Sequence, residues 1–433
     1  MNTYPSYKDS GVEWIGEIPI GWDTKRFSYS FNIQKGKIPR KLINEPLEKS
    51  LPYLSMEVLR GKNPSEYSNE DGLVIVQNGD IGLLWDGSNS GEVVRINREG
   101  ILSSTVSLLS LKDTNLKKEF SFYLLKFYED DYKNNTIGMG IPHVDGNHVK
   151  ESKLIIPSID EQTQIVSFLD TKTQKVDELI EKTEQKIKLL KEKRTSLINH
   201  CVTKGLNPNV EMKDSGVEWI GEIPRDWDIK KIKYLKSSKK YSLVDGPFGS
   251  NLKTIHYVDD GDVYIIESGF ITSGKFQYVR DFKTITNEHF ETIKRSECNE
   301  GDIIISKIGE YYGMCGILPK LDKRTVISGN SVTLTISKNH NTKFIHQVII
   351  QHRINGTFKK EVQQTGQPFI SLGVINNLII PTPNLSEQTQ IVEYLDEQTQ
   401  KIDSTIEKET QRIELLKEYR QSLISEVVTG KVD

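Results

Sequence analysis

Glu161-Gln162-Thr163-Gln164-Ile165-Val166 begins a segment that occurs twice in this chain of 433 residues. The same six residues return at 387–392, and the two segments align without a gap for about 40 residues, with more than half of the positions identical. Neither copy contains proline or glycine over that length. Charged and amide side chains surround regularly spaced apolar ones, which is typical of a long amphipathic helix.

The apolar residues of each copy follow heptad spacing. Steps of seven, four and three residues separate them, as along the a/d seam of a coiled coil. Each helix has one apolar stripe to bury, and the other copy is the available partner. We therefore predict that residues 158–206 and 381–433 form a pair of long helices. The predicted seam consists of Leu169, Val176, Ile180, Ile187, Leu190 and Leu197 in the first helix and Leu395, Ile402, Ile406, Ile413, Leu416 and Leu423 in the second.

Both helices begin and end alike. Pro157 and Pro381 follow isoleucine pairs that read as strand ends. Gly205 and Gly430 are suited to the left-handed conformation that stops a helix. The predicted N-caps are Asp160 and Ser386.

A shorter segment is repeated without any change. Lys8-Asp9-Ser10-Gly11-Val12-Glu13-Trp14-Ile15-Gly16-Glu17-Ile18-Pro19 returns at 213–224, directly after the first helix. A pseudo-twofold axis relating the halves would therefore place the end of the second helix beside residues 8–19, in a circular organisation. Such an axis also makes the helices antiparallel, with the inserts at opposite ends. A parallel pair, with both inserts at one end, is the alternative.

The stretches between the repeats differ in sequence but share a pattern of short strands and turns. Strands are predicted at 72–80, 93–97, 301–307 and 331–336, a turn-rich loop at 86–91, and helices at 120–128 and 343–355. The predicted fold class is α+β, with two α/β domains separated by an antiparallel coiled coil. The predicted divisions are 1–157, 158–206, 207–380 and 381–433.

The net charge at pH 7 is −3, but it is unevenly placed. Segment 225–380 carries 22 basic and 16 acidic residues, whereas 381–433 carries 6 and 11. A basic second insert is compatible with DNA contact and does not establish it alone. The three cysteines are widely spaced and odd in number, which indicates neither a disulfide framework nor a paired-cysteine zinc site.

No run approaches the roughly 18 apolar residues of a membrane span, and the N-terminus lacks the apolar core of a signal peptide. We therefore expect a soluble cytoplasmic protein in a reducing compartment, without membrane attachment.

No catalytic constellation is evident. The chain lacks an Asn-Pro-Pro-aromatic methyltransferase motif, a glycine-rich cofactor fingerprint and a Walker loop. Asp177 and Glu184 faintly resemble a nuclease carboxylate set, but a solvated helix face is the simpler interpretation. His346 and His352 lack metal-ligand partners at helical spacing. We expect no catalytic residue, no metal site and no cofactor bound by this chain.

Contacts with DNA require cations or loop N–H groups for phosphates, and arginine, lysine or amide side chains for base edges. Such residues cluster in turn-rich parts of both inserts, and one more lies in a predicted loop at 365–368. The candidates are Lys35, Lys37, Arg40, Lys41, Arg60, Asn89 and Ser104 in the first insert and Lys239, Lys240, Tyr241, Ser250, Asn251, Lys253, Lys307 and Gln367 in the second.

Trp14 and Trp219 occupy the same place in the repeated opening. Because that segment is copied unchanged, we predict that each tryptophan plugs the junction between its insert and the helices. Two identical surfaces would also dock two copies of one partner, so both tryptophans are candidates for partner docking.

Over essentially its whole length the chain resembles the specificity (S) subunits of type I restriction-modification systems. The resemblance is carried by the duplicated opening, by Ile-Pro followed by Glu-Gln-x-x-Ile-Val-x-x-Leu-Asp at 156–170 and 380–396, and by Gly246-Pro247-Phe248-Gly249-Ser250. The repeated helix entry is highly specific, whereas the glycine-proline loop alone is weak. The first insert has Gln34-Lys35-Gly36-Lys37-Ile38-Pro39 instead of that loop, so the role of the loop cannot be carried over to it.

The resemblance implies two target recognition domains, each reading one half of a split DNA sequence, with the helices as a ruler between them. It implies a non-catalytic subunit of a bacterial or archaeal complex. Its partners would be double-stranded DNA, two modification (M) subunits that methylate adenine with S-adenosylmethionine, and restriction (R) subunits that hydrolyse ATP with Mg and cleave DNA.

Two other classes of function remain open: a coiled-coil adaptor that bridges two protein partners without DNA, and an enzyme whose site is split across the inserts. Loss of basic loop residues would weaken a DNA reader and reduce its salt dependence, but would leave an adaptor intact. An enzyme would show turnover without partner subunits.

Overall fold

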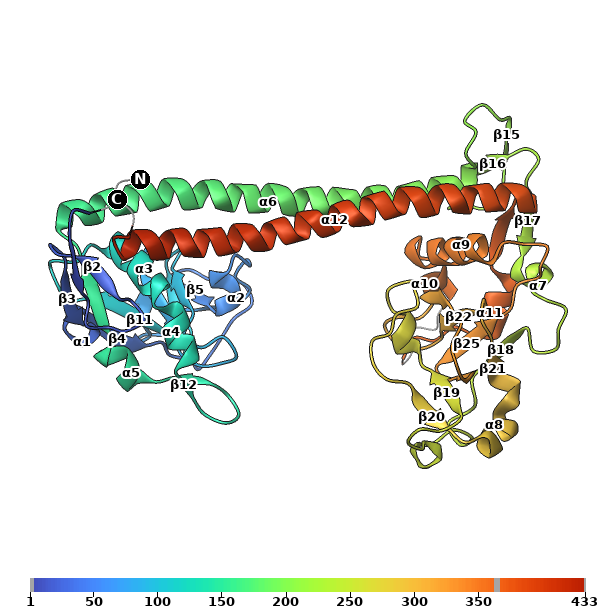
Figure 1. Ribbon diagram of the computed structural model, residues 1–433, viewed down its shortest axis with the longest axis horizontal. Coiled ribbons are helices and arrows are strands. Elements are labelled where there is room, and N and C mark those ends of the chain that lie inside the picture. The colour runs from blue at the N-terminus through green and yellow to red at the C-terminus, as the bar shows by residue number, and fades with distance from the viewer. Residues whose placement is uncertain (1–3, 362–366, 432–433) are drawn as a thin grey trace. The chain divides into compact units, whose positions relative to one another are not determined.

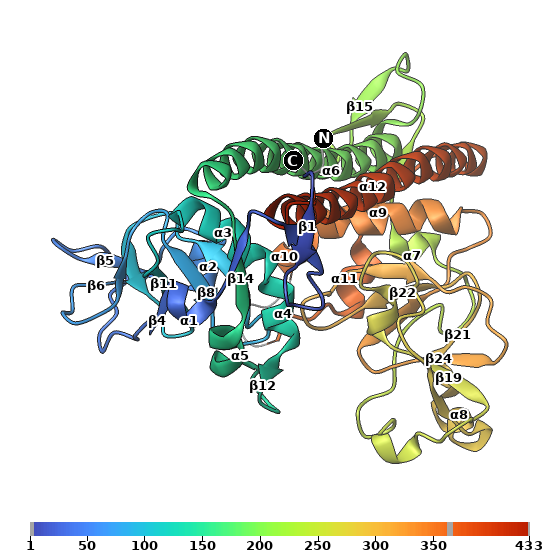
Figure 2. The same cartoon turned by 60° about the vertical axis from the view of Figure 1, so that its left-hand side comes forward.

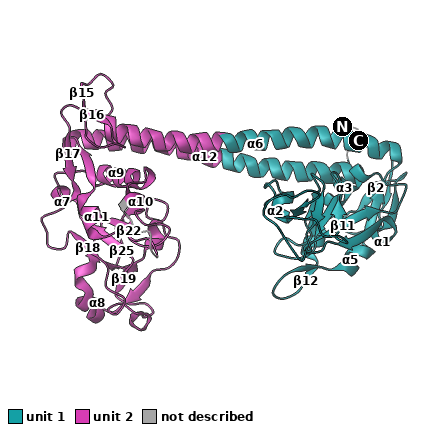
Figure 3. Ribbon diagram, turned by 180° about the vertical axis from the view of Figure 1, so that it is seen from behind, with its two compact units in different colours: residues 1–185, 409–433 teal, residues 186–408 magenta. Residues whose placement is uncertain are grey.

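The computed structural model describes residues 4–361 and 367–431. It divides into two compact units, Met1–Gln185 with Glu409–Asp433, and Lys186–Lys408 (Figure 3). The division falls inside the two long helices. Each unit therefore contains one copy of the opening segment, one insert and part of each helix.

The two repeated segments form the long helices α6 (Ile159–Lys204) and α12 (Leu385–Val428) (Figure 1). At about 1.5 Å per residue, each is roughly 65–70 Å long. All of the predicted seam residues are buried or half-buried, and Leu169 and Leu395 are at most 2% exposed. The apolar stripe of each helix is therefore its packed face.

Two ion pairs fix the direction of the helices. In the first unit, Arg420 Nε lies 3.0 Å from Asp177 Oδ1, and in the second, Arg194 Nε lies 2.8 Å from Asp403 Oδ1. From the first pair to the second, the α6 residue advances by 17 positions and the α12 residue recedes by 17. The predicted antiparallel pairing is thus confirmed, and the parallel alternative is wrong.

The helix caps differ from prediction. Ser158 Oγ accepts a hydrogen bond from the Glu161 backbone N–H at 3.3 Å, and the Glu161 carboxylate accepts one from Ser158 N–H at 3.1 Å, which forms a capping box. Asn384 Oδ1 accepts from Glu387 N–H at 3.0 Å. The caps are therefore Ser158 and Asn384, two positions before the predicted ones, and the predictions were wrong for both Asp160 and Ser386, which lie in the first turn.

Both helices stop at a glycine in the left-handed conformation, with φ of 73° at Gly205 and 69° at Gly430, as predicted. Tyr7 OH donates a hydrogen bond to Gly430 O at 3.1 Å. The end of α12 therefore meets β1 (Tyr7–Asp9), as the circular organisation requires (Figure 2).

The described part of the first unit contains two four-stranded sheets. The main sheet is antiparallel, in the order β4 (Phe31–Lys35), β11 (Val106–Leu111), β8 (Ile81–Leu84), β9 (Val93–Arg95). The second sheet is mixed, in the order β6 (Tyr67–Ser68), β5 (Leu51–Leu54), β10 (Gly100–Leu102), β7 (Ile75–Val76). The first unit also contains pairs of short strands outside these sheets. They are β1–β2 (Glu17–Pro19), β3 (Asp23–Arg26)–β14 (Lys153–Ile156) and β12 (Thr136–Ile137)–β13 (His143–Val144). Its shorter helices are α1 (Phe27–Ser30), α2 (Met56–Leu59), α3 (Lys118–Phe127), α4 (Glu129–Asn134) and α5 (Gly146–Glu151).

The second unit repeats both sheet orders. Its main sheet runs β18 (Leu243–Asp245), β25 (Ser331–Leu334), β22 (Ile303–Ser306), β23 (Cys315–Ile317), and its second runs β20 (Lys283–Ile285), β19 (Val263–Ile266), β24 (Arg324–Ile327), β21 (Glu297–Cys298). The pairs are β15 (Met212–Asp214)–β16 (Glu222–Pro224) and β17 (Asp228–Lys231)–β26 (Ile379–Thr382). The shorter helices are α7 (Ile232–Leu235), α8 (Asn287–Ile293), α9 (Thr342–Ile354), α10 (Thr357–Glu361) and α11 (Leu372–Asn377), with 3₁₀ turns η1 (Thr254–His256), η2 (Ser268–Ile271) and η3 (Lys294–Ser296). The prediction that the inserts share an α+β fold is confirmed.

One predicted strand is much shorter than expected. Of residues 72–80, only β7 is a strand, because Gly72 and Gly79 have positive φ of 76° and 86°. Asp80 Oδ2 accepts a hydrogen bond from Gln77 N–H at 2.7 Å, which closes a turn before β8. The other predicted strands and helices correspond to β9, β22, β25, α3 and α9, with ends shifted by a few residues.

Candidate nucleic-acid interface

In the first unit, the loops that follow β4 and β8 leave the main sheet at the same edge. In the second unit, the equivalent loops follow β18 and β22 and also leave at one edge. In the first unit, Gly36 N–H donates to Val106 O at 2.9 Å; in the second, Gly246 N–H donates to Ser331 O at 3.0 Å. A Cβ on Gly36 would lie 2.1 Å from Ser103 O, and one on Gly246 would lie 1.9 Å from Ser328 O. Only glycine fits such an approach. The loop after β4 is therefore the counterpart of the glycine-proline loop after β18, which the motif alone could not show.

An ion pair spans this edge in both units, with its charges exchanged. Lys35 Nζ lies 2.7 Å from Asp86 Oδ2 at the ends of β4 and β8. At the ends of β18 and β22, Asp245 Oδ2 lies 2.8 Å from Lys307 Nζ. Partial burial raises the pKa of each aspartate, but the hydrogen bonds that it accepts and the positive charges beside it, those of the paired lysine first among them, together outweigh burial and hold both pKa values below the usual range. Lys35 and Lys307 thus hold the loops in position through these ion pairs, and the Lys307 side chain is only 14% exposed.

The first unit gathers most of its predicted DNA contacts at this edge. Asn89 and Lys41 are exposed, and Ser104 is half-buried in the turn before β11. Lys37 Nζ donates to Gly72 O at 3.1 Å. The Arg40 side chain is 94% exposed, with Nε 3.7 Å from Glu70 Oε1, so it remains available to a phosphate.

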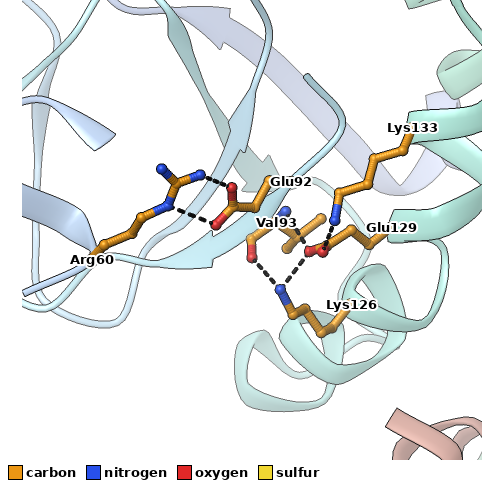
Figure 4. A network of polar contacts seen from close by, with 6 residues as sticks. All are labelled: Arg60, Glu92, Val93, Lys126, Glu129 and Lys133. Atoms are coloured by element: carbon orange, nitrogen blue, oxygen red, sulfur yellow. Dashed lines mark hydrogen bonds and ion pairs between the residues drawn. The ribbon is translucent and has the colours of Figure 1, made fainter. Parts of the chain in front are cut away.

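Arg60 lies elsewhere and is turned toward the protein. Its Nε donates to Glu92 Oε1 at 3.2 Å, and its Nη2 pairs with the other carboxylate oxygen (Figure 4). The next residue, Val93, donates its N–H to the buried Glu129 carboxylate at 2.8 Å. The hydrogen bond with Glu92 raises the pKa of Arg60. Arg60 therefore anchors the start of β9 rather than presenting a free cation.

The second unit separates its candidates into two groups. Ser250, Asn251 and Lys253 are exposed in the loop after β18. Gln367, which is exposed, joins them because Gly309 N–H donates to Pro368 O at 3.1 Å. Residues 365 and 366 of the predicted loop lie outside the described residues.

The other group precedes β18 and therefore lies at the opposite end of the sheet. Tyr241 has φ of 65° and is 47% exposed, and Lys240 Nζ lies 4.9 Å from the centre of its ring. Lys239 is exposed beside them. The structure therefore does not bring Lys239, Lys240 and Tyr241 together with the loops after β18 and β22.

Sequence reasoning missed residues that shape the loop edge. His143 Nδ1 lies 2.6 Å from Asp86 Oδ1, and Arg295 Nη2 lies 3.7 Å from Asp245 Oδ1. Phe248 and Tyr311 are 66% and 45% exposed there. Their position in turn-rich loops was the only sequence signal, because nothing in the local pattern shows which distant strand they face.

The tryptophans that plug the junction with the helices are Trp22 and Trp227. Each is 1% exposed, and each Nε1–H donates at 3.0 Å to a glutamate in the first turn of a long helix, Glu161 and Glu387 respectively. Trp14, by contrast, is 48% exposed, and Trp219 is half-buried against His352. Trp14 thus has the exposure that a docking residue needs.

Within the described residues, no group of three His, Cys, Asp or Glu side chains is placed to hold a metal ion. Among the same residues, no helix is long and apolar enough to span a bilayer.

Comparison with known protein families finds the same domain twice in this chain. The family model for the type I restriction modification DNA specificity domain matches residues 19–189 and again 248–417. The type I restriction enzyme MjaVIII specificity subunit of Methanocaldococcus jannaschii is 30% identical over 425 residues, covering 96% of this chain and 94% of that protein. The EcoBI specificity subunit of Escherichia coli is 20% identical over 460 residues, covering 100% and 87%.

Among solved structures, a chain from a study of complex assembly and conformational transition in a type I restriction-modification system matches with a TM-score of 0.69. It is 14% identical, and the match covers 96% of this chain and 99% of that one. At this identity the match shows a shared fold.

Proposed function

The chain belongs to the type I restriction modification DNA specificity family, and from this premise we propose that it reads a bipartite DNA target for such an enzyme. The observation that carries the proposal is the pair of equivalent loop edges, which share one backbone frame and differ in the side chains they present. Two such edges suit two different half-sites. The first would be read by the loops after β4 and β8 and the second by those after β18 and β22.

The exposed side chains have the required chemistry. Arg40, Lys41 and Lys253 would contact phosphates, and Asn89 and Asn251 would reach base edges. Lys35 and Lys307, which are held in ion pairs, would position loops. Lys239, Lys240 and Tyr241 would contact backbone phosphates outside the half-site, because they lie at the other end of the sheet.

The partners follow from the family. Two modification subunits would dock at the two copies of the opening segment, with restriction subunits joining them, in the cytoplasm of the host. Methylation of adenine, ATP hydrolysis and DNA cleavage would take place in those subunits, together with their S-adenosylmethionine, ATP and Mg. The helices α6 and α12 would set the length of the unread spacer.

Exchange of residues 225–380 for the corresponding insert of another family member tests the proposal. Mapping of methylated adenines in cells that carry the exchanged chain should show a change in one half of the target only. Changes in both halves, or in neither, would contradict the two-reader proposal. An adaptor that does not bind DNA would leave the methylation pattern unrelated to the insert.

A further inference from the structure

The loop after β18 in the second unit, residues 246–253, is fixed at three consecutive residues near its end. We call it the second reading loop. Asn251 O and Lys253 N–H are each hydrogen-bonded to a histidine ring, and between them the Leu252 side chain packs against the buried apolar cluster of β19, β20, β24 and α8. The side chains of Asn251 and Lys253 remain exposed. The backbone of this segment is therefore held from the protein side, which leaves two candidate DNA contacts facing solvent.

Two histidines make these hydrogen bonds. His256 Nδ1, in η1, accepts from Lys253 N–H at 3.0 Å, and His289 Nε2–H, in α8, donates to Asn251 O at 3.0 Å. The backbone partners fix the role of both ring nitrogens, because an amide N–H can only donate and a carbonyl oxygen can only accept. The two rings stack on each other, with centroids 3.9 Å apart and planes inclined by 30°. Stacking therefore joins the two hydrogen bonds into one support.

The support is attached to a well-packed helix. His289 precedes Phe290, which is fully buried, and its own N–H donates at 3.2 Å to the side chain of Thr286, the N-cap of α8. Both histidines are half-buried. The second sheet and α8 thus hold the second reading loop through the histidine pair, a connection that the sequence pattern does not show.

The surroundings of His256 oppose its protonation. Burial, the His289 ring and the Lys253 ammonium all lower the pKa of His256. A proton on Nδ1 would also remove the acceptor for Lys253 N–H and set two donors against each other. Of the acidic residues on the adjoining segments, Asp260, Asp262 and Glu291 have other partners, namely Lys323, the Asn287 N–H and Lys294, and Asp259 and Glu288 are exposed. The arrangement therefore requires a neutral His256.

We propose that His256 and His289 are positioning residues for the second half-site, which hold Asn251 and Lys253 in place to contact DNA only while His256 is neutral. The inference rests on the proposed function and deepens it, because both histidines act on DNA through the loop. The order that His256 supplies is complete above the ordinary histidine pKa of about 6.5 and declines as pH falls below it, because the pKa in the ordered loop is the lower one. Discrimination at the second half-site should therefore fall on acidification.

The first unit supports its loop differently. Arg40 N–H donates to the Glu70 carboxylate at 2.7 Å, so the acceptor there is not an imidazole. His143 faces the Asp86 carboxylate at 2.6 Å, and a proton on its ring would strengthen that contact instead of breaking it. Acidification therefore does not remove a histidine acceptor from the first loop, and the first half-site provides an internal reference.

Side chains of matching shape separate the hydrogen bonds from the titration. His256→Asn keeps an acceptor at the place of Nδ1 but takes up no proton near neutral pH. His289→Gln keeps a donor at the place of Nε2. His256→Leu and His289→Leu fill similar space and remove the acceptor and the donor. His200→Gln, at an exposed histidine of α6, is the control for loss of a histidine elsewhere.

The measurement is equilibrium competition binding by the full chain assembled with its modification subunit, at one salt concentration. The duplexes are the target found by methylation mapping and the same target with either half-site replaced; the insert exchange shows which half belongs to the second unit. The ratio of affinities is compared, because positive charge added near DNA raises the affinity for every sequence and cancels in the ratio.

At pH 7.5, His256→Leu and His289→Leu should lower discrimination at the second half-site about three- to tenfold, the usual worth of one hydrogen bond. His256→Asn and His289→Gln should retain it. At pH 5.5, discrimination by the wild type and by His200→Gln should fall by a similar factor, whereas that by His256→Asn should not. Discrimination at the first half-site should match the wild type in every variant at each pH, which also shows that the chain remains folded.

Discrimination at the second half-site that survives in His256→Leu would overturn the positioning role. An equal loss on acidification in the wild type and in His256→Asn would overturn the requirement for a neutral ring. Both results leave the proposed function standing, because the assembled chain still prefers its target at pH 7.5. Absence of any preferred target at pH 7.5 would overturn the proposed function, and this inference with it.

Discussion

Gly246 and Gly249 belong to one short motif, yet their surroundings assign them different roles. A Cβ on Gly246 would lie 1.9 Å from Ser328 O, whereas one on Gly249 would have no atom within 4 Å. Gly36 repeats the first situation against Ser103 O. One glycine of the motif is therefore required by the close approach of two backbone segments, and the other leaves its loop open.

Gly246→Ala should therefore destabilise the second unit by about 1–3 kcal/mol, because the new methyl group must displace a backbone carbonyl. Gly249→Ala, three positions away, is the matched control and should change stability by less than about 0.5 kcal/mol. Chemical denaturation followed by tryptophan fluorescence measures both. Equal effects of the two substitutions would show that the close approach is not maintained in solution.

Glu161 and Glu387 form the same hydrogen bond to a buried tryptophan, but their pKa values shift in opposite directions. Burial raises the pKa of both carboxyl groups. At Glu161, hydrogen bonds from Ser158 and Trp22 outweigh burial and lower the pKa. At Glu387, burial outweighs the Trp227 bond, and Asp226 raises the pKa further. Ionisation of Glu161 therefore favours the folded state, and ionisation of Glu387 opposes it.

We expect Glu161→Gln to cost about 1 kcal/mol at pH 7, a value reduced by the partial exposure of the group. The contribution of Glu161 exists above the unfolded-state pKa and is lost as pH falls through the lower folded-state pKa. Glu387→Gln retains an acceptor for Trp227 and should be neutral or slightly stabilising at pH 7, with this difference disappearing on acidification. Denaturation at pH 7 and pH 4 measures both variants. A loss from Glu161→Gln that is the same at the two pH values would contradict the assigned ionisation.

At the scale of elements, the heptad pattern predicted the two long helices, because one apolar stripe has a period that can be counted along the chain. It did not predict what occupies the gaps in that stripe. Arg194 and Arg420 stand at the seam steps after Leu190 and Leu416, with side chains 25% and 24% exposed. Each pairs with an aspartate of the opposite helix, and the aspartates, like the arginines, are 226 positions apart. A polar group in an apolar seam favours one register over its heptad-shifted alternatives.

Arg194→Asp should weaken the pairing of α6 and α12 in the second unit, because it places two acidic side chains together. Adding Asp403→Arg should recover most of the loss, with a coupling of about 0.5–1 kcal/mol at this partial exposure. Charge reversal of the exposed pair Lys401–Glu397, which lies along one helix, should have a smaller effect and is the control. Denaturation of the four variants of the cycle measures the coupling. Additive effects of the two reversals would exclude the ion pair as a register determinant.

For the whole molecule, the duplicated segments were enough to predict the circular organisation and the antiparallel helices. The first helix leads directly into the second copy of the opening segment, so under twofold symmetry the second helix must end beside the first copy. The site was less predictable. A sequence identifies cations such as Lys35 and Lys307 but not the carboxylates that face them across a sheet. Tyr241 and Ser250 are close together in the sequence, but β18 lies between them and separates them in the structure. Strand direction, rather than distance along the chain, decides which loops share an edge.

The last prediction concerns the proposed ruler. Because α6 and α12 run antiparallel in a fixed register, lengthening one helix alone breaks the pairing, and the two helices must be extended together. Insertion of one heptad after Lys186 and another after Gln411 preserves the seam and adds about 10 Å. At about 3.4 Å per base pair, the spacer of the recognised DNA should grow by roughly three base pairs, while both half-sites stay the same. Mapping of methylated adenines gives the spacer directly. The single insertion in α6 is the control and should lower the stability of the pair without giving a defined longer spacer. A stable double-insertion protein that still methylates the original spacing would show that the helices do not set it.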